Sequence, residues 1–488
     1  MKIFIKTYGC QMNLRDSEAT AGELNKLGHE IVHNENEADV FIFNTCSVRE
    51  KAELKAIGKI GILKKLKKKK PHLIIGIMGC MAQNRGEELL RQLPHVNFVI
   101  GTGQLHKVPE IITKIIKERE EKKQRNIAAG LSENFGVGFD EASQEILNNQ
   151  GNGERRMPRA DIQDVLLESD DEVLDSLNSH FDDTNSAISA FVAVTRGCNR
   201  FCSYCIVPYV RGREISRTIE DVVKEVTELT KNGIKEVMLL GQNVAAFGLE
   251  GDTRAPAPEN SPFADLLTEL CKIENLKRIR FVSPYPSYFN EKLINVLALE
   301  PKICNNIHLP FQSGSDRILK AMNRQYTAEQ YIEIIDKIKI AVPDVTFSTD
   351  IIVGFPGETD DDFNETRKVF NHVGFDNAYI FKYSPRKGTK AAELTDLMVT
   401  EEVKEQRNQI LLKDLTEFTT QHNAELLGSV VEVLVEGASK RNNERWSGRT
   451  STNKVVIFPP NEGVKAGDIV HVKVTKTTSM SLFGEVEK

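Results

Sequence analysis

Three closely spaced cysteines are the first residues in this sequence that could do chemistry. Cys198, Cys202 and Cys205 follow a Cys-x3-Cys-x2-Cys spacing, and Tyr204 directly precedes the last of them. Three thiolates on one short loop do not complete a tetrahedral zinc site, which needs a fourth protein ligand. They do suit a cubane iron–sulfur cluster in which one iron has no protein ligand and could be chelated by the amine and carboxylate of a small molecule. Buried structural cysteines or a disulfide pair are the alternative.

Three more cysteines are distant in the sequence but occupy equivalent positions. Cys10, Cys46 and Cys80 each come just after a short apolar run that has the character of a β-strand. In an open parallel sheet the carboxyl ends of the strands face one crevice, which is where ligands bind. We therefore expect these thiols to converge on a second metal cluster, whose open iron could hold an exogenous sulfur species. Ordinary core packing is the alternative.

Strands and helices alternate over residues 1–117 and must position this second set. Strand patterns cover Lys2–Thr7, Val40–Asn44, Leu73–Met78 and Asn97–Ile100, with helical patterns over Leu14–Leu27 and about 48–70. The near-continuous apolar run at Leu73–Met78 is typical of a parallel strand buried on both faces. The pattern predicts a doubly wound α/β domain. The basic run Lys64–Lys70 is either a solvated helix end favoured by the helix dipole or a nucleic-acid contact.

Residues 188–423 alternate between strands and helices again and must position the first set. Strands are expected at Ile188–Thr195, Glu236–Leu240, Arg278–Val282, Asn306–Pro310, Thr346–Val353 and Ala378–Phe381. Six strands with intervening helices predict a partial (β/α)6 barrel. The first cysteine loop follows the first strand, and barrel active sites lie on loops at the strand carboxyl ends.

The segment 118–187 is acidic, polar and rich in Asn and Gly. Such composition usually cannot bury enough apolar surface to fold firmly. We interpret it as a linker or insertion between domains, partly disordered, in which residues 162–181 could form a helix.

The tail, residues 424–488, has short alternating strand patterns separated by turn residues and predicts a small antiparallel five-stranded β-barrel. Basic residues surround the single tryptophan; the candidates for RNA contacts are Arg441, Arg445, Trp446, Arg449 and Lys454. Basic groups interleaved with an aromatic ring suit a single RNA strand, because bases stack while phosphates are neutralised. A structural tryptophan among ordinary surface charges is the alternative.

Composition limits the remaining possibilities. The 488 residues carry a formal net charge of −6, which does not by itself suggest a nucleic-acid partner. No apolar run reaches the roughly 18 residues of a membrane span, and the amino terminus lacks a signal-peptide core. Widely spaced cysteines in a long chain favour a reducing compartment, so we expect a cytoplasmic protein that binds no membrane and is a monomer.

Taken together, the chain resembles the radical S-adenosylmethionine (SAM) methylthiotransferase family. The resemblance rests on Tyr8–Asn13, Asn44–Cys46, Gly79–Gln83, Gly197–Glu214, His308–Ser315 and Asp350–Glu358, while Gly448–Thr450 and Asn453–Pro459 resemble a TRAM domain. The sequence Gly9-Cys-Gln-Met-Asn13 resembles the MiaB-type branch, which implies methylthiolation of carbon 2 of N6-dimethylallyladenosine at position 37 of tRNA. Branches acting on threonylcarbamoyladenosine of tRNA, or on an aspartate of ribosomal protein S12, remain alternatives. The long acidic segment departs from the linker expected in the family.

The resemblance also implies cofactors and partners. It implies two 4Fe-4S clusters, each with three cysteine ligands, and SAM both as radical source and as methyl donor. Candidate SAM contacts are Tyr204, Gln242, Asn243, Ser283, Asp350 and Gly354. Expected partners are the tRNA anticodon stem-loop, an electron donor such as flavodoxin or ferredoxin, and a sulfur donor.

Overall fold

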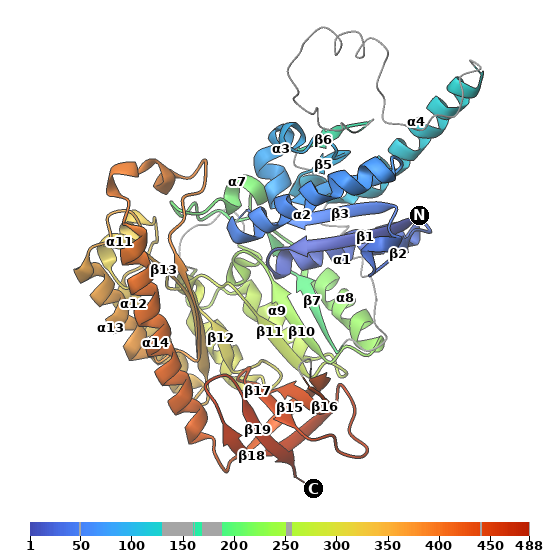
Figure 1. Ribbon diagram of the computed structural model, residues 1–488. Helices are drawn as coiled ribbons and strands as arrows, with labels where there is room; N and C mark the ends of the chain where they lie inside the picture. The colour runs from blue at the N-terminus through green and yellow to red at the C-terminus, as the bar shows by residue number, and fades with distance from the viewer. Residues whose placement is uncertain are drawn as a thin grey trace. The chain divides into compact units, whose positions relative to one another are not determined.

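The computed structural model describes residues 1–47, 50–128, 160, 162–167, 188–249, 256–439 and 442–487. The chain divides into two compact units (Figure 1). The first comprises Met1–Asp183 together with the short segment Tyr209–Gly212, and the second comprises Thr184–Pro208 and Arg213–Lys488. The segment Tyr209–Gly212 therefore belongs to the first unit, although its sequence neighbours on both sides belong to the second.

The first unit is built on a six-stranded sheet whose order is β2-β1-β3-β4-β5-β6 and whose neighbours are all parallel. The strands are β1 (Lys2–Tyr8), β2 (Glu30–Ile31), β3 (Val40–Thr45), β4 (Ile74–Gly79), β5 (Phe98–Ile100) and β6 (Asp164–Leu166). The helices are α1 (Gln11–Lys26), α2 (Glu50–Lys69), α3 (Cys80–Gln92) and α4 (Val108–Ala128), with 3-10 turns at Glu35–Glu37 and Thr102–Lys107. The expected doubly wound α/β domain is confirmed.

The central strands are apolar on both sides because the sheet has a core on each face. All six residues of β3 are buried, and so are all six of β4. Successive side chains of a strand point to opposite faces, so Phe41 and Phe43 pack in one core while Val40 and Ile42 pack in the other. The two cores fix the register of the sheet, and the register fixes where each strand ends.

The region predicted to be a linker takes part in this unit. Helix α4 continues past residue 117 to Ala128, and β6 pairs in parallel with β5 at the edge of the sheet. The helix suggested from residue 162 onward is a strand at this point, because alternate side chains are apolar on both faces: Ile162 and Leu166 pack in one core and Val165 in the other. The rest of the acidic segment lies outside the described residues.

The second unit contains two three-stranded parallel sheets, ordered β11-β10-β7 and β12-β13-β14. The strands are β7 (Ser189–Ala193), β10 (Glu236–Leu240), β11 (Arg278–Phe281), β12 (Asn306–His308), β13 (Thr346–Val353) and β14 (Asn377–Lys382). An isolated parallel bridge between Ile279 and Ile303 connects the two sheets. These six strands are the ones expected from the sequence, and they form a partial (β/α)6 barrel.

Helices follow the barrel strands and cover their outer side. They are α8 (Ile219–Lys231), α9 (Pro262–Cys271), α10 (Glu291–Leu299), α11 (Asp316–Ala321), α12 (Ala328–Ala341), α13 (Asp360–Val373) and α14 (Glu401–Glu425). A short antiparallel pair, β8 (Thr195–Arg196) and β9 (Ile215–Ser216), flanks the first cysteine loop. One large apolar core runs through the barrel from Val192 to Leu411.

The tail forms a closed barrel of order β15-β16-β17-β19-β18. Its strands are β15 (Val430–Ser439), β16 (Asn442–Arg449), β17 (Val455–Phe458), β18 (Ile469–Thr477) and β19 (Leu482–Val486). The expected five-stranded barrel is confirmed, but one pairing differs from the antiparallel prediction: β17 and β19 are parallel. Strand β18 lies between β17 and β19 in the sequence and runs antiparallel to β19, so β17 and β19 run in the same direction where they pair.

The tail barrel is fastened to the amino ends of the larger barrel's strands. Arg278, at the start of β11, donates to the carbonyl of Arg449 and forms an ion pair with Glu432 at 2.9 Å. Arg280 donates to the carbonyls of Thr450 and Ser451 at 2.7 and 3.0 Å. The loops at the strand carboxyl ends are therefore left to the cysteine site. Among the described helices, none is both long enough and apolar enough to cross a membrane.

Candidate functional site

The first cysteine loop begins two residues after β8, and hydrogen bonds to the end of α11 hold it in place. The amide of Ser203 donates to the carbonyl of Met322 at 3.0 Å, and its hydroxyl donates to the carbonyl of Ala321 at 2.8 Å. The amide of Cys205 donates to the carbonyl of Cys202 at 2.9 Å. The local turn and the external anchors together hold Cys198, Cys202 and Cys205 on one short, fixed stretch of backbone.

Burial keeps two of these thiols protonated when no metal is bound. It raises the pKa of Cys198 to about 12, and the nearby Cys202 raises it further. Burial also raises the pKa of Cys205, again with contributions from Cys202 and Cys198. The three thiols on this loop thus influence one another's protonation. Because metal ligands must be thiolates, a bound metal would release protons here.

A cation from a distant part of the chain lies beside this loop. The guanidinium of Arg324 approaches the sulfur of Cys202, with 3.8 Å between Nη1 and Sγ. It also donates to the hydroxyl of Tyr326 at 2.8 Å and lies over the ring of Tyr285 at 4.4 Å. Arg200 lies over the same Tyr285 ring at 4.1 Å. Two guanidinium groups thus lie over the ring of one tyrosine next to the cysteines. Their positive charge favours a negatively charged ligand at this site.

The structure brings several of the predicted SAM contacts to the same edge of the barrel. Gln242 and Asn243 directly follow β10, and the Asn243 side chain accepts from the amide of Tyr285 at 2.9 Å. Two buried polar atoms here, Gln242 Oε1 and Asn243 Nδ2, make no hydrogen bond within the described part of the chain. Tyr204 packs against the small core around Phe355, and burial raises the pKa of its hydroxyl. The two unpartnered amide atoms are free to recognise a polar ligand.

The remaining SAM candidates lie at the carboxyl ends of β11 and β13. Ser283 adopts a left-handed backbone conformation with φ of 60°, which is uncommon outside glycine. Asp350 lies 3.5 Å from the Nε2 of His308. Gly354 has φ of 70°, and a Cβ there would lie 2.3 Å from Lys404, so the loop after β13 requires glycine. These positions remain predictions as SAM contacts.

The second set of cysteines is brought together at the switch point of the first unit's sheet. Cys10 follows β1 and caps α1, Cys46 follows β3, and Cys80 is the first residue of α3, directly after β4. Strand β2 lies on the other side of β1, so the connections leave the sheet in opposite directions between β1 and β3, where doubly wound sheets bind ligands. Cys46 and Cys80 are buried, and Cys10 is partly exposed.

The electrostatics of this set differ from those of the first. A hydrogen bond from Cys46 lowers the pKa of Cys10 to about 5, against the opposing effect of burial and with help from the charge of Arg211. Burial raises the pKa of Cys80, while Arg211 lowers it and Cys10 raises it. Cys10 therefore interacts with both Cys46 and Cys80, and Cys10 and Cys80 share Arg211 as a cationic neighbour.

Buried amides hold the backbone that carries Cys10. Asn13 accepts from the backbone amide of Cys10 at 3.3 Å, and its Nδ2 donates to Asn44 Oδ1 at 3.0 Å. Asn44 in turn donates to the carbonyl of Asn13 at 2.8 Å and to the hydroxyl of Ser17 at 3.0 Å. A Cβ on Gly9 would lie 2.3 Å from the Asn13 side chain, so this turn is tightly closed. The network ties the loop after β1 to the end of β3.

Both sets have the chemistry of cluster ligands. Within the described residues, no three His, Cys, Asp or Glu side chains are gathered as for one metal ion. A cubane distributes its cysteines over separate irons, so the thiols need not meet at one point. Near the second set, Arg211 Nη1 and Asp16 Oδ1 are buried and make no hydrogen bond to any described residue. Soft thiolates next to a buried cation fit an anionic iron–sulfur cluster.

The tail's candidate RNA contacts are not equivalent. Arg445 and Trp446 lie on β16, with Trp446 partly buried against the core of the tail barrel. Arg449 pairs with Glu436 at 2.9 Å, and Lys454 pairs with the largely buried Asp376 at 2.6 Å. These pairs bind the two cations to the protein itself, which counts against Lys454 in particular as an RNA contact. Arg441 lies outside the described residues.

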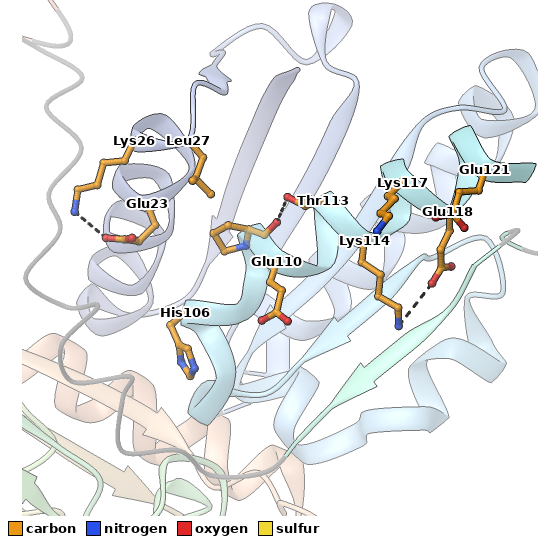
Figure 2. Close-up of a pocket in the computed structure, with 11 residues that line it drawn as sticks. Glu23, Lys26, Leu27, His106, Glu110, Thr113, Lys114, Lys117, Glu118 and Glu121 are labelled. Carbon is orange, nitrogen blue, oxygen red and sulfur yellow. Dashed lines mark hydrogen bonds and ion pairs between the residues drawn. The ribbon is translucent and has the colours of Figure 1, made fainter. Parts of the chain in front are cut away.

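A groove of about 720 Å³ between α1 and α4 is unrelated to either set (Figure 2). It lies at the carboxyl end of α1, around Glu23 and Leu27, whereas Cys10 caps the amino end of the same helix. Its charged residues pair with one another, as Lys26 does with Glu23 at 2.9 Å. It is a surface groove between two helices, lined mainly by charged side chains.

Sequence reasoning missed the two arginines that face the cysteines. Arg211 lies in the run Val207–Arg213, where a signal existed: an arginine flanked by apolar residues close to a cysteine motif. Arg324 lies 119 positions after Cys205, and only the fold brings it to the first cysteine loop.

Comparison with known families matches three regions of the chain. Residues 2–101 match the family described as uncharacterized protein family UPF0004. Residues 192–370 match the radical SAM superfamily, and residues 424–486 match the TRAM domain. The three matches fall on the first unit's sheet, the larger barrel and the tail barrel, respectively.

A solved structure shares the fold at low sequence identity. The radical S-adenosylmethionine methyltransferase TsrM from Kitasatospora setae, with tryptophan substrate and a SAM analog bound, aligns with a TM-score of 0.50 at 13% identity. The alignment covers 78% of this chain and 72% of that chain. This likeness concerns the fold alone.

Curated relatives match over almost the whole length. The tRNA-2-methylthio-N(6)-dimethylallyladenosine synthase of Opitutus terrae is 44% identical over 99% of this chain and 97% of its own. The synthase of the same name from Akkermansia muciniphila is 43% identical over 99% of this chain and 98% of its own. With this identity, both cysteine sets and all three regions in place, the chain belongs to the radical SAM family of tRNA-2-methylthio-N(6)-dimethylallyladenosine synthases.

Proposed function

We propose that this protein methylthiolates carbon 2 of N6-dimethylallyladenosine at position 37 of tRNA, with one SAM as radical source and another as methyl donor. The observation that carries the proposal is the presence of two separate three-cysteine sets, one after strand ends in each of the two units. A radical enzyme that only cleaves SAM needs one such set. A second set, with different electrostatics, calls for a second task.

Each set would hold a 4Fe-4S cluster with three protein ligands. Cys198, Cys202 and Cys205 would hold the cluster that binds SAM, and the second set would hold the cluster that carries sulfur. When bound, the clusters and SAM supply the radical and the sulfur that an unactivated carbon requires, which no side chain can supply. Burial raises the pKa of Cys198 and Cys205, and Arg324 provides positive charge beside Cys202.

The barrel edge would orient SAM through its polar side chains. The free Gln242 Oε1 and Asn243 Nδ2 are an acceptor and a donor for the polar groups of SAM. The fixed turn at Ser283 and the tight loop at Gly354 give backbone groups that a ligand can approach closely. Asp350 and Tyr204 complete the set of proposed contacts.

The tail barrel would bind the anticodon stem-loop. Trp446 supplies a ring on which a base can stack, and Arg445 supplies a charge for phosphate. Arg445 is exposed, so it is a stronger candidate than Lys454, whose ammonium is engaged. Binding that depends on phosphate contacts should weaken steeply as salt concentration rises.

The reaction also needs an electron donor such as flavodoxin or ferredoxin and a source of sulfur. All eight cysteines lie among the described residues, and none forms a disulfide. Free thiols fit a reducing cytoplasm, where we place the reaction, and we propose that the protein acts as a monomer.

The test compares two triple variants after anaerobic reconstitution. Replacing Cys10, Cys46 and Cys80 with Ala should leave cleavage of SAM to 5′-deoxyadenosine but abolish methylthiolation of tRNA, because only the sulfur site is lost. Replacing Cys198, Cys202 and Cys205 with Ala should abolish both products. Methylthiolation that persists in the first variant would exclude the sulfur role of that site.

The substrate is tested separately. Mass analysis of tRNA nucleosides from cells lacking this protein should show N6-dimethylallyladenosine without its methylthio group, while threonylcarbamoyladenosine derivatives and ribosomal protein S12 are unchanged. Loss of the modification from either of the latter instead would reassign the substrate but not the chemistry.

A further inference from the structure

Arg211 is a buried cation in the first unit, although the residues before and after its segment in the sequence belong to the second unit. It ends the short helix α7 (Val207–Arg211), six residues after Cys205, yet packs with the first unit as part of the segment Tyr209–Gly212. The hydroxyl of Thr102 donates to the carbonyl of Val210 and anchors this segment. Only 3% of the Arg211 side chain is exposed, so its position is costly unless its charge is compensated.

Only one of the two terminal nitrogens of the guanidinium forms a hydrogen bond with Asp16. Arg211 Nη2 donates to Asp16 Oδ2 at 2.7 Å, and the Asp16 side chain is 1% exposed. The other atoms of a possible two-pronged pair, Arg211 Nη1 and Asp16 Oδ1, are buried and make no hydrogen bond to the residues that the structure describes. Arginine and carboxylate groups that serve only to fasten two elements usually pair through both prongs. Here one prong is left unused.

The guanidinium acts electrostatically on two of the cysteines. The charge of Arg211 lowers the pKa of both Cys10 and Cys80, and for Cys80 it is a larger influence than the opposing charge of Asp16. The thiols in turn raise the pKa of Arg211 against the effect of burial. The pair therefore does not cancel at the cysteines, which experience a net positive charge from it.

We propose that Arg211 is a positioning residue that holds a fixed positive charge and a free N–H against the cluster on Cys10, Cys46 and Cys80, and so favours binding of a sulfur anion at its open iron. The inference rests on the proposed function, because it presupposes that these cysteines hold a cluster. The ligand class is a monoanionic sulfur species, such as hydrosulfide or methanethiolate. A neutral residue at position 211 would leave the ligands in place but remove the preference for the anion.

The same charge should act on the reduction potential of the cluster. Taking up one electron makes a cluster more negative, and a nearby cation stabilises the more negative state. Removing the cation should therefore lower the potential. A tenfold change in the one-electron equilibrium constant corresponds to about 59 mV.

The experiment uses the full-length chain with Cys198, Cys202 and Cys205 replaced by Ala, so that any cluster signal comes from the second set. In this background R211Q removes the charge, and R211K keeps a charge but not the two-pronged geometry. Because R211Q leaves Asp16 buried without a counter-charge, the double variant D16N/R211Q provides a neutral pair that should fold. The matched control is R213Q, which removes the same charge from an exposed residue two positions away.

Three quantities are measured after anaerobic reconstitution: iron per chain, the midpoint potential in a dithionite titration followed by electron paramagnetic resonance, and the apparent Kd for sodium sulfide and for methanethiolate. We expect D16N/R211Q to bind both anions at least tenfold more weakly and to have a lower potential by the equivalent of a tenfold change. R211K should lie between this variant and the parent, and R213Q should match the parent.

Two outcomes would overturn it, and they differ. If the parent holds a cluster and D16N/R211Q shows the same iron content, potential and anion affinities, Arg211 is only a structural pair and the proposed function stands. If the parent itself holds no cluster, the second cluster of the proposed function fails, and the inference fails with it.

Discussion

The two cysteine sets place the same three ligands by different means. Cys198, Cys202 and Cys205 lie on one loop, and the loop brings them together whatever surrounds it. Cys10, Cys46 and Cys80 come from three strand ends, and only the register of the sheet brings them together. The arrangement of the first set therefore depends on one short loop, whereas that of the second depends on the fold of the whole sheet.

The two sets also differ in how charge is supplied. Beside the first set, Arg324 is held by tyrosine rings and hydroxyl groups. Beside the second, Arg211 is held by the carboxylate of Asp16. A cation held by rings and hydroxyl groups has no formal negative charge beside it, whereas one held by a carboxylate is partly neutralised before it acts on the cysteines. The difference predicts unequal sensitivity of the two regions to single substitutions.

The largest effect is expected from Asp16→Ala. It leaves Arg211 buried without a partner, and breaking a buried pair in this way costs about 3–5 kcal/mol. The loss should appear as faster hydrogen–deuterium exchange in β1, β3 and β4 of the metal-free protein, because local opening reports local stability. The milder Asp16→Asn is the control; an equal loss in both variants would show that the charge of Asp16 is unimportant.

A smaller difference, roughly a hundredfold, is expected in thiol reactivity. At pH 7 Cys10 lies above its pKa of about 5 and is a thiolate, whereas Cys198 lies far below its pKa of about 12 and is a thiol. The thiolate is the reactive form, so iodoacetamide should label Cys10 of the metal-free protein first. Lowering the pH through 5 should slow Cys10 only. Mass spectrometry of the labelled peptides measures both rates, and equal labelling at pH 7 would contradict the predicted contrast.

Asn44→Ala should cost about 1–3 kcal/mol, because it leaves buried groups of Asn13 and Ser17 without their partners. The effect that tests this role is a change in the amount of bound iron. Iron bound by the second set should fall, since Asn13 no longer holds the amide of Cys10, while iron bound by the first set is unchanged. Iron analysis in each triple-cysteine background separates the two. Equal iron loss in both backgrounds would indicate general unfolding.

The smallest effect is expected from Tyr326→Phe beside the first set. It removes a hydroxyl that bonds Arg324 and the carbonyl of Phe311, a loss of about 1 kcal/mol. The ring remains, so Arg324 should stay beside Cys202. Cleavage of SAM should therefore fall only a few-fold in a deoxyadenosine assay. A loss as large as that of Asp16→Ala would remove the distinction between the two cations.

The same contrast explains what the sequence could predict. The Cys-x3-Cys-x2-Cys loop and the strand ends at Cys10, Cys46 and Cys80 are local patterns, so both sets could be predicted as ligand sets from the sequence. The six barrel strands could be predicted because each is a short apolar run. Arg211 and Arg324 could not be assigned, because their roles depend on contacts with residues far away in the sequence. Strand β6 was missed for the same reason, since its three residues become a strand only by pairing with β5.

The attachment of the tail barrel has a consequence for how such enzymes can diversify. Arg278 and Arg280 bind it through the backbone carbonyls of residues 449–451, and Arg278 adds one side-chain ion pair, with Glu432. Backbone recognition is indifferent to which residues occupy those positions, provided the chain keeps its path. Substitutions at residues 449–451 should thus be tolerated at this joint, and a tail barrel from a relative could be grafted onto the larger barrel if it keeps a carboxylate at the position of Glu432.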